Sequence, residues 1–475
     1  MEQKIKRRFN RIRLHNPEEV TLFFNFKDGT KHKGFVWDFS RFGLGLILDE
    51  EYPITKNSIL YECELSAYGQ IRTLGEAEIV RIEKKDKKLF LGLSLHKEFV
   101  DMDMLSERRT IHIQADEINN LGLNLRNGTI IKDEFKLFTA SFVFGLSVFK
   151  KHLDELDAKF AKEPSSLKHT LFDSVMQGIG KELWVFLEQE IEKLKILVKN
   201  YSKSENEKHG FFLRRAMWNF ILESEFIKRT NLKPRGYAGD SDMMEMLYKM
   251  EFSGNSSFGK IFHKHPVDTK AAWAVRNRRK LIVGEINKSI SAFDNSKDFK
   301  LLSIACGPAW ELQDFFSESP NNYIEAVLLD QDTEALGQAK NRIESIPTKV
   351  PFKVTYLKES VRTILRSSNP EITFGKYNFI YSMGLYDYLT DSVAKVLTEK
   401  LYSMLAIGGT LIIGNYHIEN ETRIYMEYIM DWVLFYRDEE SLMELTSDFK
   451  GKFSVEIGFD NSGTQMFLKI IKISN

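Results

Sequence analysis

The chain has 475 residues, more than one hydrophobic core normally holds, so we expect two to four domains. Hydrophobic residues make up 43% of the chain and charged residues 28%, values that are ordinary for globular proteins. The 67 basic and 67 acidic side chains cancel, so net charge points to no particular partner. The only cysteines, Cys63 and Cys306, exclude a disulfide framework and a cysteine zinc site.

Neither the N-terminus nor any apolar segment predicts export or membrane insertion. The first residues, MEQKIKRRFNRIRLHN, are basic and have no apolar stretch behind them. The longest apolar run, FKLFTASFVFGLSVF at 135–149, is too short to span a bilayer and predicts a buried helix. The HKHP segment at 263–266 lacks further metal ligands at suitable spacing, so we expect no metal site. These features predict a cytoplasmic protein of bacterial type.

Residues 20–95 predict a small all-β domain. Segments such as VTLFFNF, HKGFVWDF, GLGLIL and SILYECEL are strands of five to eight residues, and turn signals such as KDG and EKKDKK separate them. No long helical pattern interrupts the series. We therefore predict a small antiparallel barrel or sandwich in a first domain, residues 1–105.

The middle of the chain predicts helices. FKLFTASFVFGLSVFKKHLDELDAKF, KELWVFLEQEIEKLKILVKNY and FFLRRAMWNFILESEFIKRT have apolar residues at three- and four-residue spacing. A loop with proline and glycine, NLKPRGYAGD, leads into a methionine-rich helix that is either core packing or a malleable wall for a lipid. We assign 106–270 to a helical linker or lid region.

After Lys300, short apolar strands alternate with amphipathic helices. This pattern predicts an α/β domain with a mostly parallel, doubly wound sheet, residues 271–475. The last two strand segments, FSVEIGFD and TQMFLKIIKI, are joined by NSG and predict a hairpin that adds an antiparallel edge. The predicted fold class is thus multidomain, with a β-barrel, a helical middle and a doubly wound sheet.

The first loop of this sheet, in LLSIACGPAWEL (301–312), has small residues where a ligand must approach the backbone. Gly307, Ala305 and Ala309 leave that room. The next predicted strand ends at Asp330, roughly twenty residues beyond the loop, where a carboxylate accepts hydrogen bonds from ribose hydroxyls. A single glycine and no P-loop lysine disfavour NAD and ATP. S-adenosylmethionine has no phosphate and still needs the ribose carboxylate.

Four segments in this order, followed by a terminal hairpin, resemble a class I S-adenosylmethionine-dependent methyltransferase: LLSIACGPAWEL, LLDQD, YSMGLYDYLTD and IGGTLIIGNY. The usual acid-x-Gly-x-Gly-x-Gly of that family stands here as Ser303, Ala305, Gly307 and Ala309, a departure that bears on cofactor affinity. The resemblance implies an S-adenosylmethionine site built from Ala305, Gly307, Pro308, Asp330, Gln331, Glu359, Ser360 and Ser382.

A narrower resemblance concerns the methyl acceptor. LKPRGYAGDSDMMEMLY, ACGPAWEL, GLYDYL and GNYHIENETRIYMEYIMDWVLFYR are similar to methyltransferases of 3-hydroxypalmitic acid methyl ester biosynthesis, over roughly residues 130–475. This resemblance implies a small-molecule acceptor, a fatty-acid carboxylate or hydroxyl, without fixing which.

Methyl transfer is an in-line displacement in which a carboxylate acceptor needs no base, whereas an alcohol or amine needs one. His417 follows the fifth predicted strand, and Tyr386 and Asp387 follow the fourth, at the ligand end of the sheet. A solvated loop residue is the alternative for His417. The YAGD turn either presents Tyr237 and Asp240 as a lid or is purely structural. The substrate-side candidates are Tyr237, Asp240, Tyr386 and His417.

The N-terminal segment KIKRRFNRIR (4–13) has six basic side chains and no acid. Together with Asp38-x-Ser40-x-x-Gly43 it resembles the two-part signature of the PilZ domain, a bacterial receptor for cyclic di-GMP. A guanidinium can bind the guanine O6 and N7 edge in bidentate fashion, and it can also bind phosphate. The alternatives are a solvated tail and a strand corner. The resemblance implies a dinucleotide site formed by Arg7, Arg8, Arg11, Asp38, Ser40 and Gly43, with Arg13 and Arg41 as neighbours.

The sequence therefore predicts an S-adenosylmethionine-dependent methyltransferase that responds to cyclic di-GMP and acts on a small-molecule acceptor. The sequence leaves the oligomeric state open, and a homodimer is one of the alternatives. A second hypothesis is a non-enzymatic cyclic di-GMP effector, whose degenerate methyltransferase fold docks a partner. A third, an RNA methyltransferase, is disfavoured by the neutral charge and by the lack of a basic patch interleaved with aromatic residues.

Overall fold

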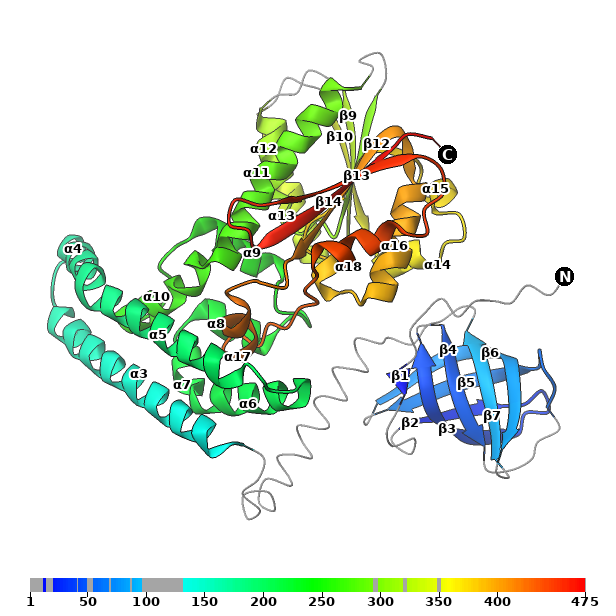
Figure 1. The fold of residues 1–475 in the computed structure, drawn as a ribbon, viewed down its shortest axis with the longest axis horizontal. Coiled ribbons are helices and arrows are strands. Elements are labelled where there is room, and N and C mark those ends of the chain that lie inside the picture. Colours follow the sequence, from blue (N-terminus) through cyan, green and yellow to red (C-terminus); the bar gives the residue numbers. More distant parts are fainter. Residues whose placement is uncertain are drawn as a thin grey trace. The chain divides into compact units, whose positions relative to one another are not determined.

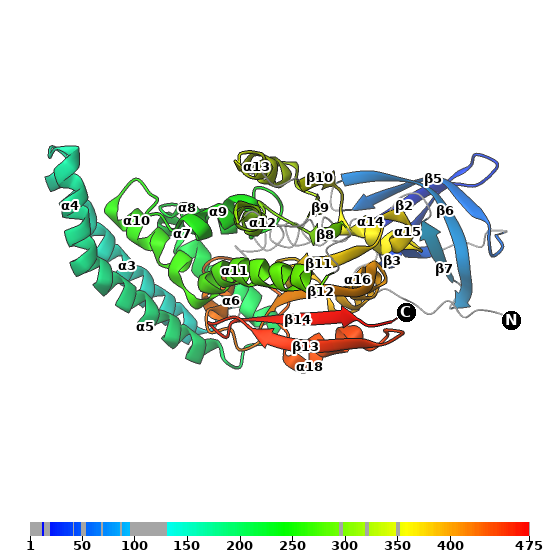
Figure 2. The same cartoon turned by 90° about the horizontal axis from the view of Figure 1, so that it is seen from above.

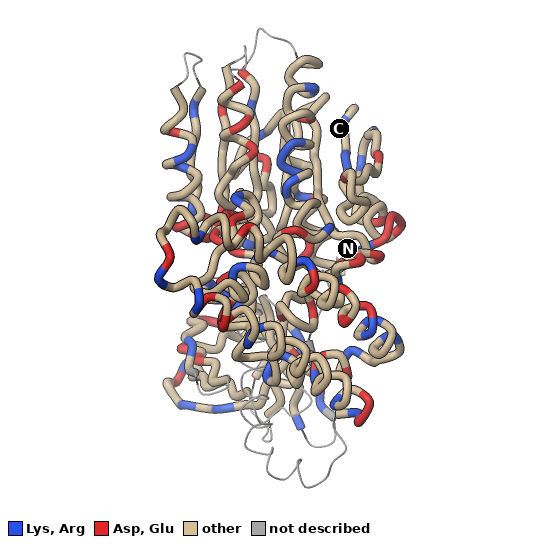
Figure 3. Tube along the Cα trace, turned by 90° about the vertical axis from the view of Figure 1, so that its left-hand side faces the viewer, with Lys and Arg blue, Asp and Glu red and all other residues tan. Residues whose placement is uncertain are grey.

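The computed structural model describes residues 12–13, 20–40, 42–48, 54–67, 70–85, 88–95, 131–293, 298–318, 323–347 and 352–474. The chain divides into two compact units, residues 1–129 and 130–475 (Figure 1). Lysines and arginines are interspersed with acidic residues along the described chain (Figure 3). Among the helices described, none is both long and apolar enough to cross a membrane.

The first unit contains the predicted antiparallel barrel. Strand order β3-β2-β5-β6-β7-β4, closed by the pairing of β4 with β3, makes a ring of six strands among the described residues. Inward-facing apolar residues, such as Val20, Leu22 and Phe24 on β2, alternate with exposed ones and fill the interior. The strands are β1 (Ile12–Arg13), β2 (Val20–Asn25), β3 (Lys31–Ser40), β4 (Gly43–Leu48), β5 (Ile59–Ala67), β6 (Gln70–Lys85) and β7 (Lys88–Leu95).

The second unit begins with the predicted helical region, in which α3 and α5 lie side by side (Figures 1 and 2). The helices are α3 (Asp133–Phe160), α4 (Ser165–Val175), η2 (Met176–Gly180), α5 (Lys181–Val198), α6 (Lys203–Ala216), α7 (Trp218–Ile221), α8 (Glu225–Leu232), α9 (Ser241–Lys249), α10 (Ser257–Lys264), η3 (Pro266–Asp268) and α11 (Lys270–Ser291).

Helix α3 corrects one expectation. The apolar run 135–149 predicted a buried helix, but only one face of α3 is buried, through residues such as Phe135 and Phe142. Leu137, Phe144 and Val148 on the other face are 73%, 69% and 53% exposed. The run is apolar on both faces, but among the described residues the helix packs against partners on only one of them.

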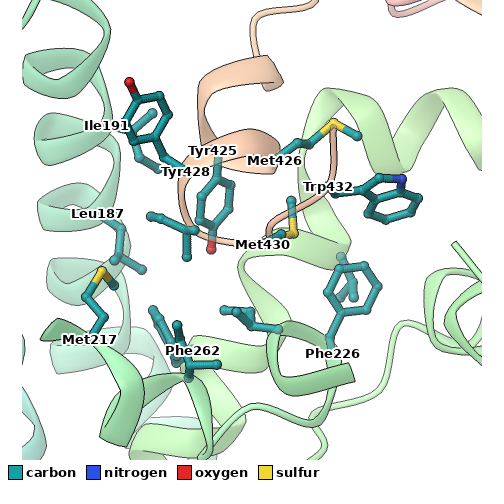
Figure 4. Close-up of a cluster of buried hydrophobic side chains, with 14 of the residues drawn as sticks. Leu187, Ile191, Met217, Phe226, Phe262, Tyr425, Met426, Tyr428, Met430 and Trp432 are labelled. Carbon is teal, nitrogen blue, oxygen red and sulfur yellow. The ribbon is translucent and has the colours of Figure 1, made fainter. Parts of the chain in front are cut away.

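The core of the helical region includes side chains from much later in the chain. Tyr425, Met426, Tyr428, Met430 and Trp432 enter a cluster formed with helix residues (Figure 4). The helix residues labelled there are Leu187, Ile191, Met217, Phe226 and Phe262. Chain segments on both sides of the predicted 270/271 boundary therefore share one core, and that boundary stays a prediction.

The predicted doubly wound sheet follows, in the strand order β10-β9-β8-β11-β12-β14-β13. The first five strands in this order are parallel, and β14 runs antiparallel to both β12 and β13, which confirms the predicted terminal hairpin. The strands are β8 (Phe299–Ile304), β9 (Ile324–Asp330), β10 (Phe352–Lys358), β11 (Tyr377–Ser382), β12 (Leu405–Tyr416), β13 (Phe453–Phe459) and β14 (Gln465–Lys472).

Helices cover both faces of this sheet. One apolar cluster joins α11, α12 and α13 to one face, and a second joins α14, α16 and α18 to the other. The chain order reverses between β8 and β11, and such a switch point is where open α/β sheets bind ligands. The remaining helices are α12 (Trp310–Ser317), α13 (Thr333–Glu344), α14 (Val361–Arg366), α15 (Pro370–Thr373), η4 (Tyr386–Tyr388), α16 (Asp391–Ser403), α17 (Arg423–Tyr428), α18 (Glu439–Met443) and η5 (Glu444–Thr446).

Candidate functional site

The loop that follows β8 has an unusual backbone. Ala305, Gly307 and Ala309 all adopt left-handed conformations, with φ of 51°, 56° and 50°. These are the three positions at which the methyltransferase signature has glycine. An L-residue in this region pays a steric cost of about 1–2 kcal/mol. The loop therefore keeps a glycine-type backbone although alanine occupies two of its three positions.

Asp330, at the end of β9, connects this loop to the next one. Its Oδ2 accepts a hydrogen bond from the Gly307 amide at 2.8 Å, and its Oδ1 accepts one from the Asp332 amide at 2.9 Å. Burial raises the pKa of the carboxyl above its usual value, against the lowering effect of these amides. A carboxylate has about four lone-pair positions. The two amides leave acceptor capacity for ribose hydroxyls.

The other predicted cofactor residues lie on the loops at the same edge of the sheet. The Ser382 hydroxyl, at the end of β11, donates to the Ile304 carbonyl at 3.0 Å and so ties the two switch-point strands together. The Glu359 amide donates to the Asp330 carbonyl at 3.1 Å, and Ser360 caps α14. The Pro308 carbonyl accepts from Arg342, and Gln331 is exposed. Their cofactor contacts stay predictions.

Helix α9 is fixed over this side of the domain by polar contacts. Glu245 accepts a hydrogen bond from the Trp310 indole at 2.8 Å and pairs with Arg342. Asp242 accepts from Gln338 of α13 at 2.8 Å. Two guanidiniums lie over the Trp310 ring, with the Arg342 Cζ 4.0 Å and the Arg279 Cζ 4.5 Å from the ring centre. Trp310 is the first residue of α12, and Gln338 lies in α13. Both helices follow loops at the edge of the sheet where the ligand is expected.

The loop before α9 contains a chain of ion pairs that sequence reasoning missed. Arg229 pairs with Asp240 and Asp242, each at 2.7 Å. Arg235 pairs with Asp242 at 2.9 Å and with Asp332 at 2.8 Å, and it also reaches Glu334. Asp332 lies two residues after Asp330 in sequence, so Arg235 holds the loop to the ribose side of the site. Nothing in the motif LKPRGYAGD separates this arginine from a solvated one.

Tyr237 and Asp240, two of the substrate-side candidates, have different surroundings. Tyr237 is partly buried and its ring makes an edge contact with Tyr388, with the centroids 6.3 Å apart. Burial raises its pKa, and the charges of Asp330 and Asp332 add to the rise. Asp240 is fully buried, caps α9 through the Met243 amide and binds Arg229 with both oxygens. Tyr237 therefore lies within electrostatic reach of Asp330, whereas both Asp240 oxygens already have partners.

Tyr386 and His417, the other two candidates, contact the protein rather than open space. The Tyr386 hydroxyl is 3.0 Å from the Thr398 hydroxyl, and the side chain is fully buried. The His417 Nε2 is 3.4 Å from a Glu439 oxygen, and its ring edge meets Phe459. Asp387, next to Tyr386, accepts a hydrogen bond from the Tyr416 amide at 2.7 Å. Burial raises the pKa of the Asp387 carboxyl to about 6. The catalytic roles of Tyr386 and His417 stay predictions.

Glu311, in the first turn of α12, is a further half-buried acid near the loop that follows β8. One of its oxygens accepts a hydrogen bond from the Tyr381 hydroxyl at 2.8 Å. Burial raises the pKa of this carboxyl, and the nearby Arg278 and Arg279 charges oppose the rise. Sequence analysis passed over Glu311 because an acid in the first helical turn is common for reasons of the helix dipole alone.

In the barrel, a β-bulge shapes the predicted dinucleotide motif. The register between β3 and β4 shifts between Val36 and Asp38, so that Trp37 and Asp38 together oppose Gly45. A Cβ at Gly45 would lie 2.2 Å from the Asp38 Oδ1 and 2.4 Å from the Trp37 Nε1. Asp38 is 4% exposed. The bulge therefore turns both side chains over Gly45, a glycine that the signature did not single out.

Ser40 and Gly43 form the turn between β3 and β4. They are register partners, and the Ser40 hydroxyl donates to the Gly43 carbonyl at 3.3 Å. On the other edge of β3, the β1 backbone pairs Ile12 with Phe39 and Arg13 with Asp38. Arg7, Arg8, Arg11 and Arg41 lie outside the described residues. The described end of the basic segment, Ile12–Arg13, thus pairs with β3 at Asp38.

Comparisons with known proteins give similarities of fold. No family model matches the sequence, and no curated protein matches it. A protein of Bordetella parapertussis described as a possible exported protein is 15% identical, with a TM-score of 0.43, over 66% of this chain and 100% of its own. Magnesium protoporphyrin IX methyltransferase of Synechocystis, solved with S-adenosylhomocysteine, is 10% identical, with a TM-score of 0.32, over 42% and 84%. YcgR of Escherichia coli, solved with cyclic di-GMP, is 14% identical, with a TM-score of 0.19, over 25% and 50%.

Proposed function

We propose that the second unit is an S-adenosylmethionine-dependent methyltransferase acting on a small molecule. The observation that supports this most directly is the loop from Ala305 to Ala309, whose three left-handed residues and whose hydrogen bond to Asp330 make a cradle without a phosphate site. Strained backbone at non-glycine positions persists only where the surroundings enforce it, and it concentrates at functional sites. In the proposed enzyme, S-adenosylmethionine supplies an activated methyl group.

The protein contributes orientation and exclusion of water. Asp330 accepts from the ribose, the loop backbone approaches the ligand, and Tyr237 and α9 cover the site. Holding donor and acceptor in line accounts for much of the rate enhancement of such a displacement. A carboxylate acceptor attacks as its anion and needs no base. A hydroxyl acceptor requires one, for which His417 is our candidate from the sequence.

Calorimetry with S-adenosylhomocysteine tests this proposal. The full chain should bind the compound with one site per chain, and Asp330→Ala should weaken the binding at least tenfold because two ribose hydrogen bonds to a charged acceptor are lost. Lys353→Ala, a change at the surface of β10, is the control and should bind like the wild type. Absence of wild-type binding would favour the non-enzymatic effector, which the alanines at 305 and 309 make the second candidate.

We further propose that the barrel binds cyclic di-GMP and that binding alters methyl transfer. The supporting observations are the bulge that presents Trp37 and Asp38 and the pairing of the basic segment beside them. Guanine presents donors to a carboxylate and acceptors to a guanidinium, and phosphate takes the remaining arginines. Arg11→Ala and Asp38→Ala should each abolish measurable dinucleotide binding.

Coupling between the two sites is measured by titrating S-adenosylhomocysteine with and without saturating cyclic di-GMP. If cyclic di-GMP regulates donor binding, it must change the affinity for S-adenosylhomocysteine by some factor. S-adenosylhomocysteine must then change the affinity for cyclic di-GMP by the same factor. Equal donor affinities together with equal methyl-transfer rates would contradict the regulatory part of the proposal while leaving both binding sites intact.

A further inference from the structure

Three arginines lie close together on α11, and within the part of the chain that the structure describes one of them, Arg278, has no ion pair with an acid. Arg279 binds Asp314 through two nitrogens, and Arg276 donates to the Leu247 and Val267 carbonyls and reaches Asp268. Arg278 donates to the Met383 carbonyl at 2.9 Å and lies 3.6 Å from the Met244 sulfur. Among the residues that the structure describes, no carboxylate oxygen lies within 4.0 Å of the Arg278 guanidinium.

The lack of an acidic partner is unusual because the Arg278 side chain is buried, with only 9% of its surface exposed. Buried charges in proteins are normally paired, since removing an ion from water is costly. The buried Arg437 follows that rule and pairs with Asp391 at 2.9 Å, and the half-buried Arg214 pairs with Asp431 at the same distance. A guanidinium has five N–H donors in a planar fork, so its neutral partners, the Met383 carbonyl, the Met244 thioether and the Tyr248 hydroxyl, still leave donors available.

Arg278 lies at the ligand edge of the sheet. Its carbonyl partner, Met383, directly follows β11, and Gly384 has no side chain on the side facing the guanidinium, where a Cβ would be 3.4 Å from Nη2. Met244 belongs to the covering helix α9. The charge of Arg278 also opposes the burial-driven rise in pKa of Glu311, Asp387 and Tyr388, so all three face it within electrostatic reach.

We infer that Arg278 binds a carboxylate of a molecule held in the methyl-transfer site. The planar fork of the Arg278 guanidinium matches a carboxylate in bidentate geometry. A ligand carboxylate bound there would give Arg278 the direct ion pair that it lacks among the described residues. This inference rests on the proposed methyltransferase function. Two molecules in that site can present a carboxylate: the methyl donor, through its amino-acid end, and the acceptor.

Calorimetry on the full chain separates the two sources. S-adenosylhomocysteine has the amino-acid carboxylate and 5′-methylthioadenosine lacks the whole amino-acid end, so the pair isolates the donor. Octanoate and 1-octanol, titrated with S-adenosylhomocysteine already bound, form the matching pair for the acceptor. The variants are Arg278→Met, Arg278→Lys, which keeps the charge without the fork, and, as the control, Lys280→Met at an exposed position of the same helix.

If the donor supplies the carboxylate, Arg278→Met binds S-adenosylhomocysteine about ten- to a hundredfold more weakly and 5′-methylthioadenosine unchanged. If the acceptor supplies the carboxylate, Arg278→Met binds S-adenosylhomocysteine as the wild type does. Its affinity for octanoate falls about ten- to a hundredfold, and its affinity for 1-octanol is unchanged. Arg278→Lys should show a smaller loss in the same arm, and it replaces the Met variant if that variant does not fold. Lys280→Met should match the wild type throughout.

Three results would overturn the inference. If folded Arg278 variants bind every ligand with unchanged affinity, the inference about Arg278 is wrong and the proposed function still stands. An equal loss for S-adenosylhomocysteine and 5′-methylthioadenosine would mean a general disturbance of the site and no role for the carboxylate. Failure of the wild type to bind either adenosine compound would refute the proposed function, and the inference with it.

Discussion

At residue scale, Ala305 shows how much the ligand loop departs from ordinary backbone. Its φ of 51° is unfavourable for any residue with a Cβ. Ala305→Gly should therefore raise the free energy of unfolding, by up to about 1 kcal/mol after allowing for the greater freedom of glycine in the unfolded chain. Chemical denaturation measures this change. Ala140→Gly, in the interior of α3, is the matched control and should lower stability by about 1 kcal/mol; equal losses in both variants would contradict the strained loop.

Asp387 predicts a dependence of stability on pH. Burial raises its pKa to about 6 in the folded chain, against 3.8 for the unperturbed group. Between these two values the folded state holds a proton that the unfolded state has released, so stability falls as pH rises from about 4 to 6 and is then level. The loss from this one group is roughly 3 kcal/mol.

Denaturation of the wild type and Asp387→Asn at several pH values isolates that contribution. Asparagine keeps an oxygen for the Tyr416 amide but cannot ionise, so the variant should lack this part of the decline. Glu440→Gln, at an exposed carboxyl, is a suitable comparison. Parallel pH profiles for the wild type and Asp387→Asn would show that the residue titrates normally.

The sequence predicted some of these residues and not others, for physical reasons. Asp330 follows from its distance to the loop and from the end of an apolar strand. Arg278 could not be distinguished, because VRNRRK places three arginines on one helix and their partners, at 244, 268, 314 and 383, are brought together only by folding. Asp240 and Tyr386 have plausible positions in sequence, but the contacts of their side chains are set by Arg229 and Thr398.

At the scale of elements, the β3–β4 bulge predicts a specific role for Gly45. Any side chain there would displace Asp38 and Trp37, because even a Cβ would lie within 2.4 Å of both. Gly45→Ala should weaken cyclic di-GMP binding at least tenfold, as measured by calorimetry, while the barrel remains folded by circular dichroism. Thr73→Ala, on β6, is the control. Wild-type affinity in Gly45→Ala would show that the bulge does not position the motif.

Element types followed from the sequence more easily than this detail did. Alternating apolar residues predicted the barrel strands, and three- and four-residue spacing predicted the helices. A bulge adds one residue without changing composition, and the aromatic run FVWDF hides the shift in register. Periodicity likewise could not show that α3 would leave Leu137 and Phe144 exposed, since a run that is apolar all round does not reveal how many partners it has.

At the scale of the whole molecule, the shared core predicts where the chain can be divided. Residues 425–434 pack among the helices of the 131–275 region, so a fragment of residues 271–475 would expose both halves of that cluster. Such a fragment should aggregate or unfold, whereas 130–475 should fold and bind S-adenosylhomocysteine and 1–129 should bind cyclic di-GMP. Expression followed by thermal denaturation and calorimetry tests all three. A folded 271–475 fragment would show that the sheet does not need the helices.

The chain of ion pairs before α9 also bears on which ligands this protein excludes. It joins two guanidiniums to four carboxylates, Asp240, Asp242, Asp332 and Glu334, and leaves the ribose side of the site with excess negative charge even before Asp330 is counted. A nucleotide with a phosphate chain would be repelled there, whereas the sulfonium and ammonium groups of S-adenosylmethionine would be attracted. In the proposed enzyme, the ion pairs that hold the loop before α9 would therefore also disfavour the binding of ATP and NAD.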